Sequence, residues 1–233
     1  MRIITLVTQK GGAGKTTLAA SLAVAAHAAG EAVIALDLDP QRSLASWGDE
    51  RKAEMPAVDK IEVEQLVTLP HILRELPKQG FTLAVLDTAG VANTATNMAL
   101  QVSDLCLIPA RPTRLDIQAT WPTVDAVKRI GKPFAFVLNQ CPPLPRNSRS
   151  TEAAAGLQLL GVLAEPTIIQ RADHQDAIAA GLGVTEYAPR EKAAEEIRML
   201  WEWIDHRMTR REYGKASIDH RISEHHTRGG KCA

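Results

Sequence analysis

The chain has 233 residues, of which 45% are apolar and 23% charged, and these proportions suit one α/β domain with a buried core. The formal net charge is zero, so overall charge does not indicate a nucleic-acid or membrane partner, although seven basic and three acidic residues follow His206. Three widely spaced cysteines argue against a disulfide framework and favour a reducing cytoplasm, and we expect neither a signal peptide nor a membrane span.

Apolar runs typical of strands alternate along the chain with stretches of helical spacing. In chain order we predict a strand at 2–7, a helix at 15–30, a strand at 32–40, a helix at 41–53, a weak strand at 61–63, a helix at 69–78, strands at 81–90, 105–110 and 133–140, and a last strand at 166–170. This alternation predicts an α/β fold with a doubly wound, mostly parallel sheet flanked by helices. Ligands of such sheets bind at the carboxyl ends of the strands.

The last predicted helix covers residues 190–208 and carries an apolar face. That face consists of Ile197, Leu200, Trp201, Ile204 and Met208. We expect it to dock onto the sheet, and a helix lying on a membrane surface is the alternative. The following residues are polar and poor in apolar side chains, so we predict one domain at 1–208 and a basic, disordered tail at 209–233.

The segment TQKGGAGKTT, residues 8–17, lies between the first strand and the first helix. A glycine-rich turn in this position directs backbone N–H groups and the helix N-terminus at an anion. Lys15 then reaches the β- and γ-phosphates of a nucleotide, and the Thr16 hydroxyl ligates Mg²⁺. The full predicted loop is Gly11, Gly12, Ala13, Gly14, Lys15, Thr16 and Thr17. The alternative is a glycine-rich turn that binds nothing.

Acidic residues end two of the predicted strands. Asp87 closes the apolar run LAVLD, where an unpaired carboxylate is costly, so we expect it to face Mg²⁺. Asp37 and Asp39 lie two residues apart and therefore point to the same side of a strand. We expect Asp37 to help hold the Mg²⁺ waters and Asp39 to orient the attacking water. Helix N-capping by Asp39 before Pro40 is the alternative.

Three of these segments together resemble the ParA/MinD family of ATPases. KGGAGKTT is similar to the deviant Walker A loop of that family, LDLDPQRSLASW to the switch segment after it, and AVLDTAG to the Walker B strand. The resemblance spans residues 1 to about 204, and the DPQ at 39–41 leans to the ParA side. Because the chain starts at the first strand, it resembles the short ParA type that lacks an N-terminal helix-turn-helix domain.

The resemblance also implies roles for single residues. Lys10 matches the signature lysine that reaches the partner's nucleotide in a sandwich dimer, where it acts as an arginine finger does; the alternative is a solvated surface lysine. Gly90 resembles the residue that senses the γ-phosphate. Asn139 resembles a base-reading asparagine, although a strand-end asparagine is as often a turn former. Asp116 matches a recurrent position near the dimer face, without a derivable role.

At the level of the whole protein, the resemblance implies an Mg²⁺-dependent ATPase that forms a homodimer on ATP and binds double-stranded DNA non-specifically. A ParB-like adaptor on a centromere-like site then stimulates hydrolysis, which partitions plasmids or chromosomes in the cytoplasm, at the nucleoid in the ATP state. DNA phosphates need Lys and Arg. The candidates are Arg171, Arg190, Lys192, Arg198, Arg207, Arg210 and Arg211. For Arg198, which lies among glutamates, a solvated helix surface is the alternative.

Three other functions compete with this interpretation. A MinD-like membrane ATPase needs an apolar-basic helix at the C-terminus, whereas the terminus ISEHHTRGGKCA has no apolar face, so we expect no stable membrane association. An iron–sulfur reductase of the nitrogenase iron-protein type needs two exposed cysteines, whereas Cys106 lies in a strand and Cys141 beside two prolines. A ParA-like ATPase that positions a cargo other than DNA has the same chemistry and stays open.

Overall fold

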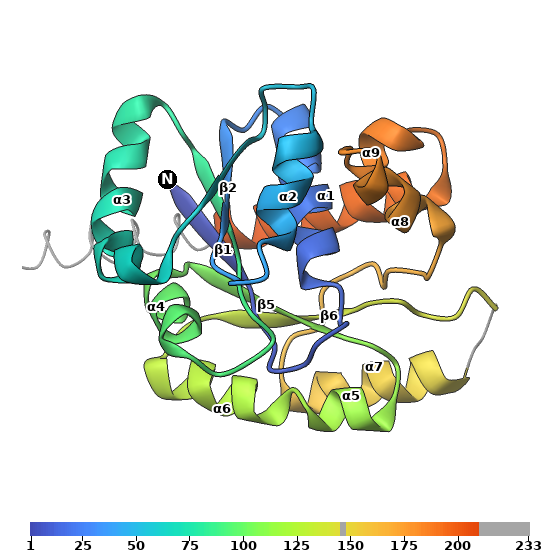
Figure 1. The fold of residues 1–233 in the computed structure, drawn as a ribbon. Coiled ribbons are helices and arrows are strands. Elements are labelled where there is room, and N and C mark those ends of the chain that lie inside the picture. Colours follow the sequence, from blue (N-terminus) through green and yellow to red (C-terminus); the bar gives the residue numbers. More distant parts are fainter. Residues whose placement is uncertain (145–147, 210–233) are drawn as a thin grey trace, which may run out of the picture.

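The structure, a computed structural model, describes residues 1–144 and 148–209, so the predicted tail lies outside it except for Thr209. Within this part a six-stranded sheet has the order β3-β2-β4-β1-β5-β6, and every neighbouring pair is parallel (Figure 1). The strands are β1 Arg2–Leu6, β2 Val33–Asp37, β3 Ala57–Lys60, β4 Leu83–Asp87, β5 Leu105–Ala110 and β6 Phe134–Leu138. The predicted doubly wound parallel sheet is confirmed.

Helices cover both faces of this sheet. They are α1 Lys15–Ala28, α2 Ser43–Glu50, α3 Leu69–Glu75, α4 Thr94–Val102, α5 Arg114–Gln118, α6 Trp121–Ile130, α7 Ser148–Leu160, α8 Ala172–Ala179, α9 Val184–Tyr187 and a final helix over 192–209, with 3₁₀ turns η1 Val63–Thr68 and η2 Leu76–Gln79. One face packs against α1, α2, α8, α9 and the final helix, and the other against α3, α4, α6 and α7 (Figure 1).

The strands are apolar on both sides because each side meets a helical layer. In β4, Leu83 and Val85 belong to the core under α1, and Ala84 and Leu86 to the core under α3 and α4. Successive side chains of a strand point to opposite faces, so a doubly covered strand needs apolar residues throughout. This is why the strands were predictable as continuous apolar runs.

Three predicted elements were wrong in position or type. The strand predicted at 61–63 lies earlier, at Ala57–Lys60, where exposed Asp59 and Lys60 on an edge strand hide the apolar pattern. Ile61 follows the strand as a core residue. The strand predicted at 166–170 is a single bridge between Cys141 and Ile169. The helix predicted at 41–53 is shorter, since the chain first makes a turn in which Arg42 has a φ of 56°.

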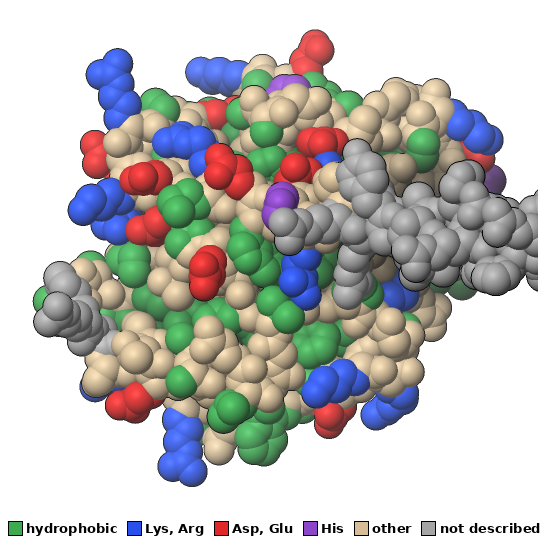
Figure 2. All heavy atoms as spheres, turned by 180° about the vertical axis from the view of Figure 1, so that it is seen from behind, with side chains coloured by type: hydrophobic (Ala, Val, Ile, Leu, Met, Phe, Trp, Pro, Cys, Tyr) green, Lys and Arg blue, Asp and Glu red, His purple; other side chains and the backbone are tan. Residues whose placement is uncertain are grey.

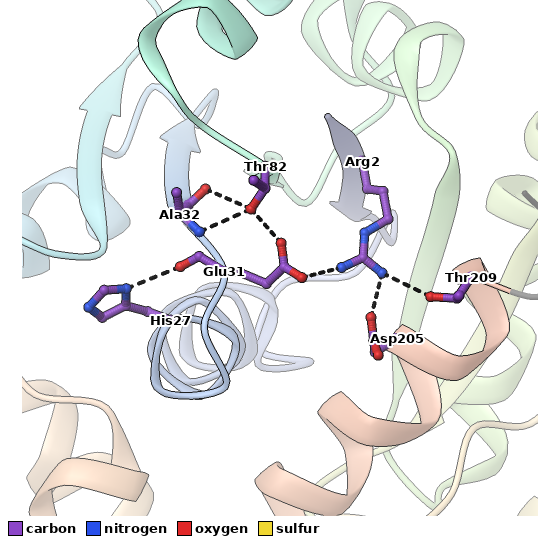
Figure 3. Close-up of polar contacts among 7 residues, drawn as sticks. All are labelled: Arg2, His27, Glu31, Ala32, Thr82, Asp205 and Thr209. Carbon is purple, nitrogen blue, oxygen red and sulfur yellow. Dashed lines mark hydrogen bonds and ion pairs between the residues drawn. The ribbon is translucent and has the colours of Figure 1, made fainter.

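The apolar face of the final helix is buried in the core, as predicted, so it is not available to a membrane surface. At its C-terminal end a polar cluster joins the helix to the sheet: Arg2 donates to Asp205 and Thr209 of the helix and to Glu31, whose carboxylate also accepts from Thr82 (Figure 3). We call this cluster the Arg2 clasp. The Arg2 clasp holds Thr209 next to the amino ends of the strands. Within the described ranges no helix is long and apolar enough to cross a membrane.

Candidate functional site

The loop at 8–14 joins β1 to α1 at the carboxyl end of a central strand. Gly12 and Gly14 have φ values of 76° and 87°, which only glycine adopts without strain. Gly14 is the N-cap of α1, and no side chain there accepts a hydrogen bond from the first turn. The first N–H groups of α1, a helix of 14 residues, are therefore left for an anion.

Lys15 is buried although it carries an ammonium group. Its Nζ donates to the Lys10 carbonyl oxygen at 3.3 Å, so the side chain folds back over the loop. Burial lowers the pKa of Lys15, while the negative charges of Asp87 and Asp39 oppose that shift. The loop therefore holds a cation where an anion would meet the helix N-terminus.

Asp87, at the end of β4, lies beside the start of α1. The Thr16 hydroxyl donates to its Oδ2 at 2.6 Å, while its buried Oδ1 has no hydrogen-bond partner among the described residues. Burial raises the pKa of Asp87 to about 7, and the charge of Asp37 adds to this effect. A carboxylate with a free lone pair, next to a hydroxyl and a second acid, fits Mg²⁺.

Mg²⁺ at this place would be held by Thr16 and Asp87 together with phosphate oxygens and water, because Mg²⁺ uses few protein ligands. The described part of the chain has no group of three or more His, Cys, Asp or Glu arranged to hold a metal by themselves. When bound, the ion would neutralise charge on the phosphates.

Asp37 is almost fully buried and holds the start of α2. Its Oδ1 accepts from the Asp39 N–H and its Oδ2 from the Ala45 N–H, both at 2.9 Å. Burial raises the pKa of Asp37, and these hydrogen bonds oppose the shift. The capping role considered for Asp39 thus belongs to Asp37. Asp39 instead accepts from Gln41 N–H at 3.0 Å and closes the turn before α2.

Two segments from other strands brace the loop. A Cβ at Gly90 would lie 3.2 Å from the Gly11 nitrogen, so the chain after β4 packs directly on the loop backbone. Asn139 donates its amide to the Ala13 carbonyl at 2.8 Å, and Gln140 donates to the Gly12 carbonyl at 3.3 Å. Base reading by Asn139 stays a prediction, and the bracing by Gln140 was not foreseen from the sequence.

Substituting Gly14 with alanine should destabilise the protein more than the same change at Gly12. Both residues have positive φ, but a Cβ at Gly14 would lie 2.4 Å from the Asn139 amide nitrogen, whereas a Cβ at Gly12 would have no described atom within 4 Å. We expect each variant to lose about 1 kcal/mol through backbone strain and Gly14→Ala about 1–3 kcal/mol more through the clash. Urea unfolding of the two variants measures the difference. Equal losses would contradict the bracing by Asn139.

Asp116, for which the sequence supplied no role, stabilises the segment after β5. Its carboxylate accepts from Arg111 Nε and Nη2, at 3.2 and 3.1 Å, and from the Thr113 hydroxyl. The Thr113 hydroxyl in turn accepts from the Asp116 N–H and caps α5.

The neighbouring helix α6 contacts the phosphate loop, because the Gln9 N–H donates to the Thr123 hydroxyl at 3.2 Å.

The residues predicted to contact DNA lie in different environments. Arg171 is half-buried and paired with Glu196 at 2.7 Å, and Arg207 stacks on Trp203 at 5.3 Å. Arg190, just before the final helix, and Lys192 and Arg198, on that helix, are exposed, and Arg198 donates to the Pro189 carbonyl oxygen at 2.8 Å. Arg210 and Arg211 lie outside the described residues. On the face drawn in Figure 2, basic and acidic side chains are interspersed.

Both described cysteines are buried, and burial raises the pKa of the Cys106 thiol to about 12. Neither Cys106 nor Cys141 lies at the surface, where the iron–sulfur alternative requires them.

Known proteins resemble this chain in sequence and in fold. The family described as VirC1 protein matches residues 1–140. The maintenance of carboxysome distribution protein A of Gloeobacter kilaueensis is 32% identical over 210 residues, which are 88% of this chain and 94% of that protein. Protein ParA of Rhizobium radiobacter is 30% identical over 181 residues, which are 73% of this chain and 79% of that protein. Among solved structures, one of similar fold is the septum site-determining protein MinD of Pyrococcus horikoshii, complexed with Mg-ADP. Its TM-score is 0.70 at 20% sequence identity, and the match covers 88% of this chain and 96% of the MinD chain.

Proposed function

The chain belongs to the VirC1/ParA family of P-loop ATPases, and we propose that it dimerises on ATP, binds DNA non-specifically and partitions plasmid or chromosomal DNA. A ParB-like adaptor would stimulate hydrolysis of ATP to ADP and phosphate and so release the DNA. The protein would work in the cytoplasm and lie on the nucleoid in its ATP state. Relatives whose names describe chromosome partitioning support this proposal, and the geometry of the site supports its chemistry.

The observation that carries the proposal is the convergence of one buried cation and two acids, Asp87 and Asp39, at one glycine-rich loop. Lys15 lies on the loop, Asp87 bonds to the Thr16 beside it, and the charge of Asp39 acts on both Lys15 and Asp87. With a Mg²⁺ nucleotide bound, Lys15 would meet the phosphates, Asp87 the Mg²⁺ and Asp39 the attacking water. Mg-ADP in the related MinD structure supports the same cofactors here.

Lys10 is the residue through which ATP would control association. Lys10 is half-buried, and its carbonyl group has a neighbour on each side. The Lys15 ammonium lies 3.3 Å from the Lys10 carbonyl oxygen, and a Cβ at Gly90 would lie 3.3 Å from the Lys10 carbonyl carbon. A nucleotide that draws Lys15 to its phosphates would release this carbonyl. The Lys10 side chain would then cross to the partner's nucleotide and couple ATP binding to dimer formation.

Lys10→Ala should therefore block ATP-dependent dimerisation while leaving ATP binding within about threefold of the unchanged chain, because Lys15 stays in place. Light scattering with Mg-ATP measures the dimer, and a fluorescent nucleotide measures binding. Lys78→Ala, at an exposed lysine paired with Glu75, is the control and should dimerise normally. Unchanged dimerisation in Lys10→Ala would reduce Lys10 to a surface charge.

The DNA part of the proposal is tested by binding to non-specific duplex DNA with ATP, with ADP and across a salt series. We expect ATP-dependent binding that weakens steeply with salt, because a protein that binds DNA phosphates releases counterions. Arg190, Lys192 and Arg198 are the described exposed candidates. Replacing one of them with alanine should reduce the salt slope by about one if that side chain binds a phosphate.

A cargo other than DNA is the second candidate, and the relative named for carboxysome distribution favours it. ATP-dependent dimerisation without DNA binding would support this candidate over partitioning. Sedimentation with liposomes only in the presence of ATP would instead support a MinD-like membrane ATPase.

A further inference from the structure

The helix α2 joins the acids of the nucleotide site to a buried arginine at its other end. Arg51 follows α2 directly, and its side chain is only 2% exposed. Its two terminal nitrogens bond to both carboxylate oxygens of Glu186, each at 3.0 Å, and to the carbonyl oxygens of Gly181 and Met55, at 3.1 and 2.8 Å. The guanidinium also stacks on Trp47, 4.8 Å from the ring centre. A bidentate, buried and stacked arginine has one defined position.

Two further contacts hold the segment at 181–186 against α2. The buried Trp47 donates its Nε1 to the Leu182 carbonyl at 3.1 Å. Gly181 has a φ of 68°, and a Cβ there would lie 2.6 Å from the Glu50 carbonyl oxygen. The glycine therefore permits a backbone approach that any side chain would prevent.

At the opposite end, α2 is attached to the acids. Asp37 accepts from the Ala45 N–H in the first turn and from the Asp39 N–H, and the Asp39 carbonyl accepts from the Arg42 N–H at 2.8 Å. The helix has eight residues and so spans about 12 Å. A helix this short, fixed at both ends, moves as one body.

We propose that Arg51 is a positioning residue for Asp37 and Asp39, and that through α2 it links the nucleotide site to the segment around α9. If Arg51 releases Glu186, α2 gains freedom, and the acids at its start lose their alignment with the nucleotide. This inference rests on the proposed ATPase activity.

The test is the isosteric variant Glu186→Gln, which removes the charge opposite Arg51 and keeps an oxygen for the Gly183 N–H, from which Glu186 now accepts at 2.9 Å. We expect kcat for ATP to fall about tenfold or more, because small misplacement of a catalytic group is costly, while the Kd for ATP stays within about twofold. Hydrogen exchange of residues 43–50 should become faster.

The matched control is Glu31→Gln in the Arg2 clasp, since Glu31 is likewise a carboxylate paired with an arginine but lies at the amino ends of the strands (Figure 3). It should keep the kcat of the unchanged chain. Equal loss of kcat in both variants, or no loss in Glu186→Gln, would overturn the inference. An unchanged chain that hydrolyses no ATP would instead overturn the proposed function, and the inference with it.

If Glu186→Gln does not fold, Trp47→Phe serves as the second variant, because it removes the bond to Leu182 and retains an aromatic ring beneath Arg51. We expect a smaller fall in kcat, again without weaker ATP binding. An unchanged kcat in this variant would count against the inference.

Discussion

Lys15→Ala should abolish ATP turnover and weaken nucleotide binding by about 10- to 150-fold, the range expected for losing a hydrogen bond to a charged group worth about 1.5–3 kcal/mol. Lys15 is held inside the loop, with its ammonium 3.3 Å from the Lys10 carbonyl oxygen. Alanine leaves the phosphate charge without this cation. Titration with a fluorescent ATP analogue measures binding, and phosphate release measures turnover.

The controls for this variant separate lost chemistry from lost folding. Lys15→Arg keeps the charge but changes its shape, so it should bind nucleotide better than Lys15→Ala and still turn it over poorly. Circular dichroism of both should match that of the unchanged chain. Turnover by Lys15→Ala at the original rate would mean that the glycine-rich turn is not the phosphate site.

Asp39→Ala should bind ATP with nearly unchanged affinity but hydrolyse it about 10²- to 10⁴-fold more slowly, because general-base catalysis contributes about this much. The carboxylate of Asp39 is half-exposed, and its negative charge acts on Lys15 and Asp87. Without hydrolysis, the ATP-bound dimer should accumulate. Single-turnover hydrolysis and light scattering on the same sample measure both effects.

Asp39→Asn distinguishes the proposed catalytic role from a structural one. The amide oxygen can still accept from the Gln41 N–H, which now donates to Asp39 at 3.0 Å, so the turn before α2 survives. We expect the asparagine variant to be as slow as the alanine variant. If asparagine restored hydrolysis, Asp39 would shape the turn and would not orient water.

The phosphate loop was predictable because its chemistry is local in sequence. Three glycines, a lysine and a threonine within residues 11–16 determine the turn and the start of α1, and β4 ends in Asp87 where its apolar run ends. The parallel sheet followed from strands covered on both faces. Edge strand β3 was misplaced because half of its residues face solvent and carry charges.

Contacts between distant segments could not be predicted from the sequence. Arg51 and Glu186 are 135 residues apart, as are Trp47 and Leu182, and neither pair has a local pattern. Likewise, Asn139 reaches the Ala13 carbonyl across 126 residues. That Asp37 rather than Asp39 accepts from the first turn of α2 was also not predictable, since only the position of α2 decides which carboxylate meets that turn.

The central claim of the proposed function is that ATP controls dimer formation. ATP would bind on the phosphate loop and act on the partner copy through Lys10. The mass of the full chain, measured by light scattering with Mg-ADP and with Mg-ATP, tests this dependence. We predict a monomer of 25.3 kDa with ADP and twice that mass with ATP, and a monomer in both conditions for Lys10→Ala. A mass that is the same with ATP and ADP, in a chain that binds both nucleotides, would contradict it.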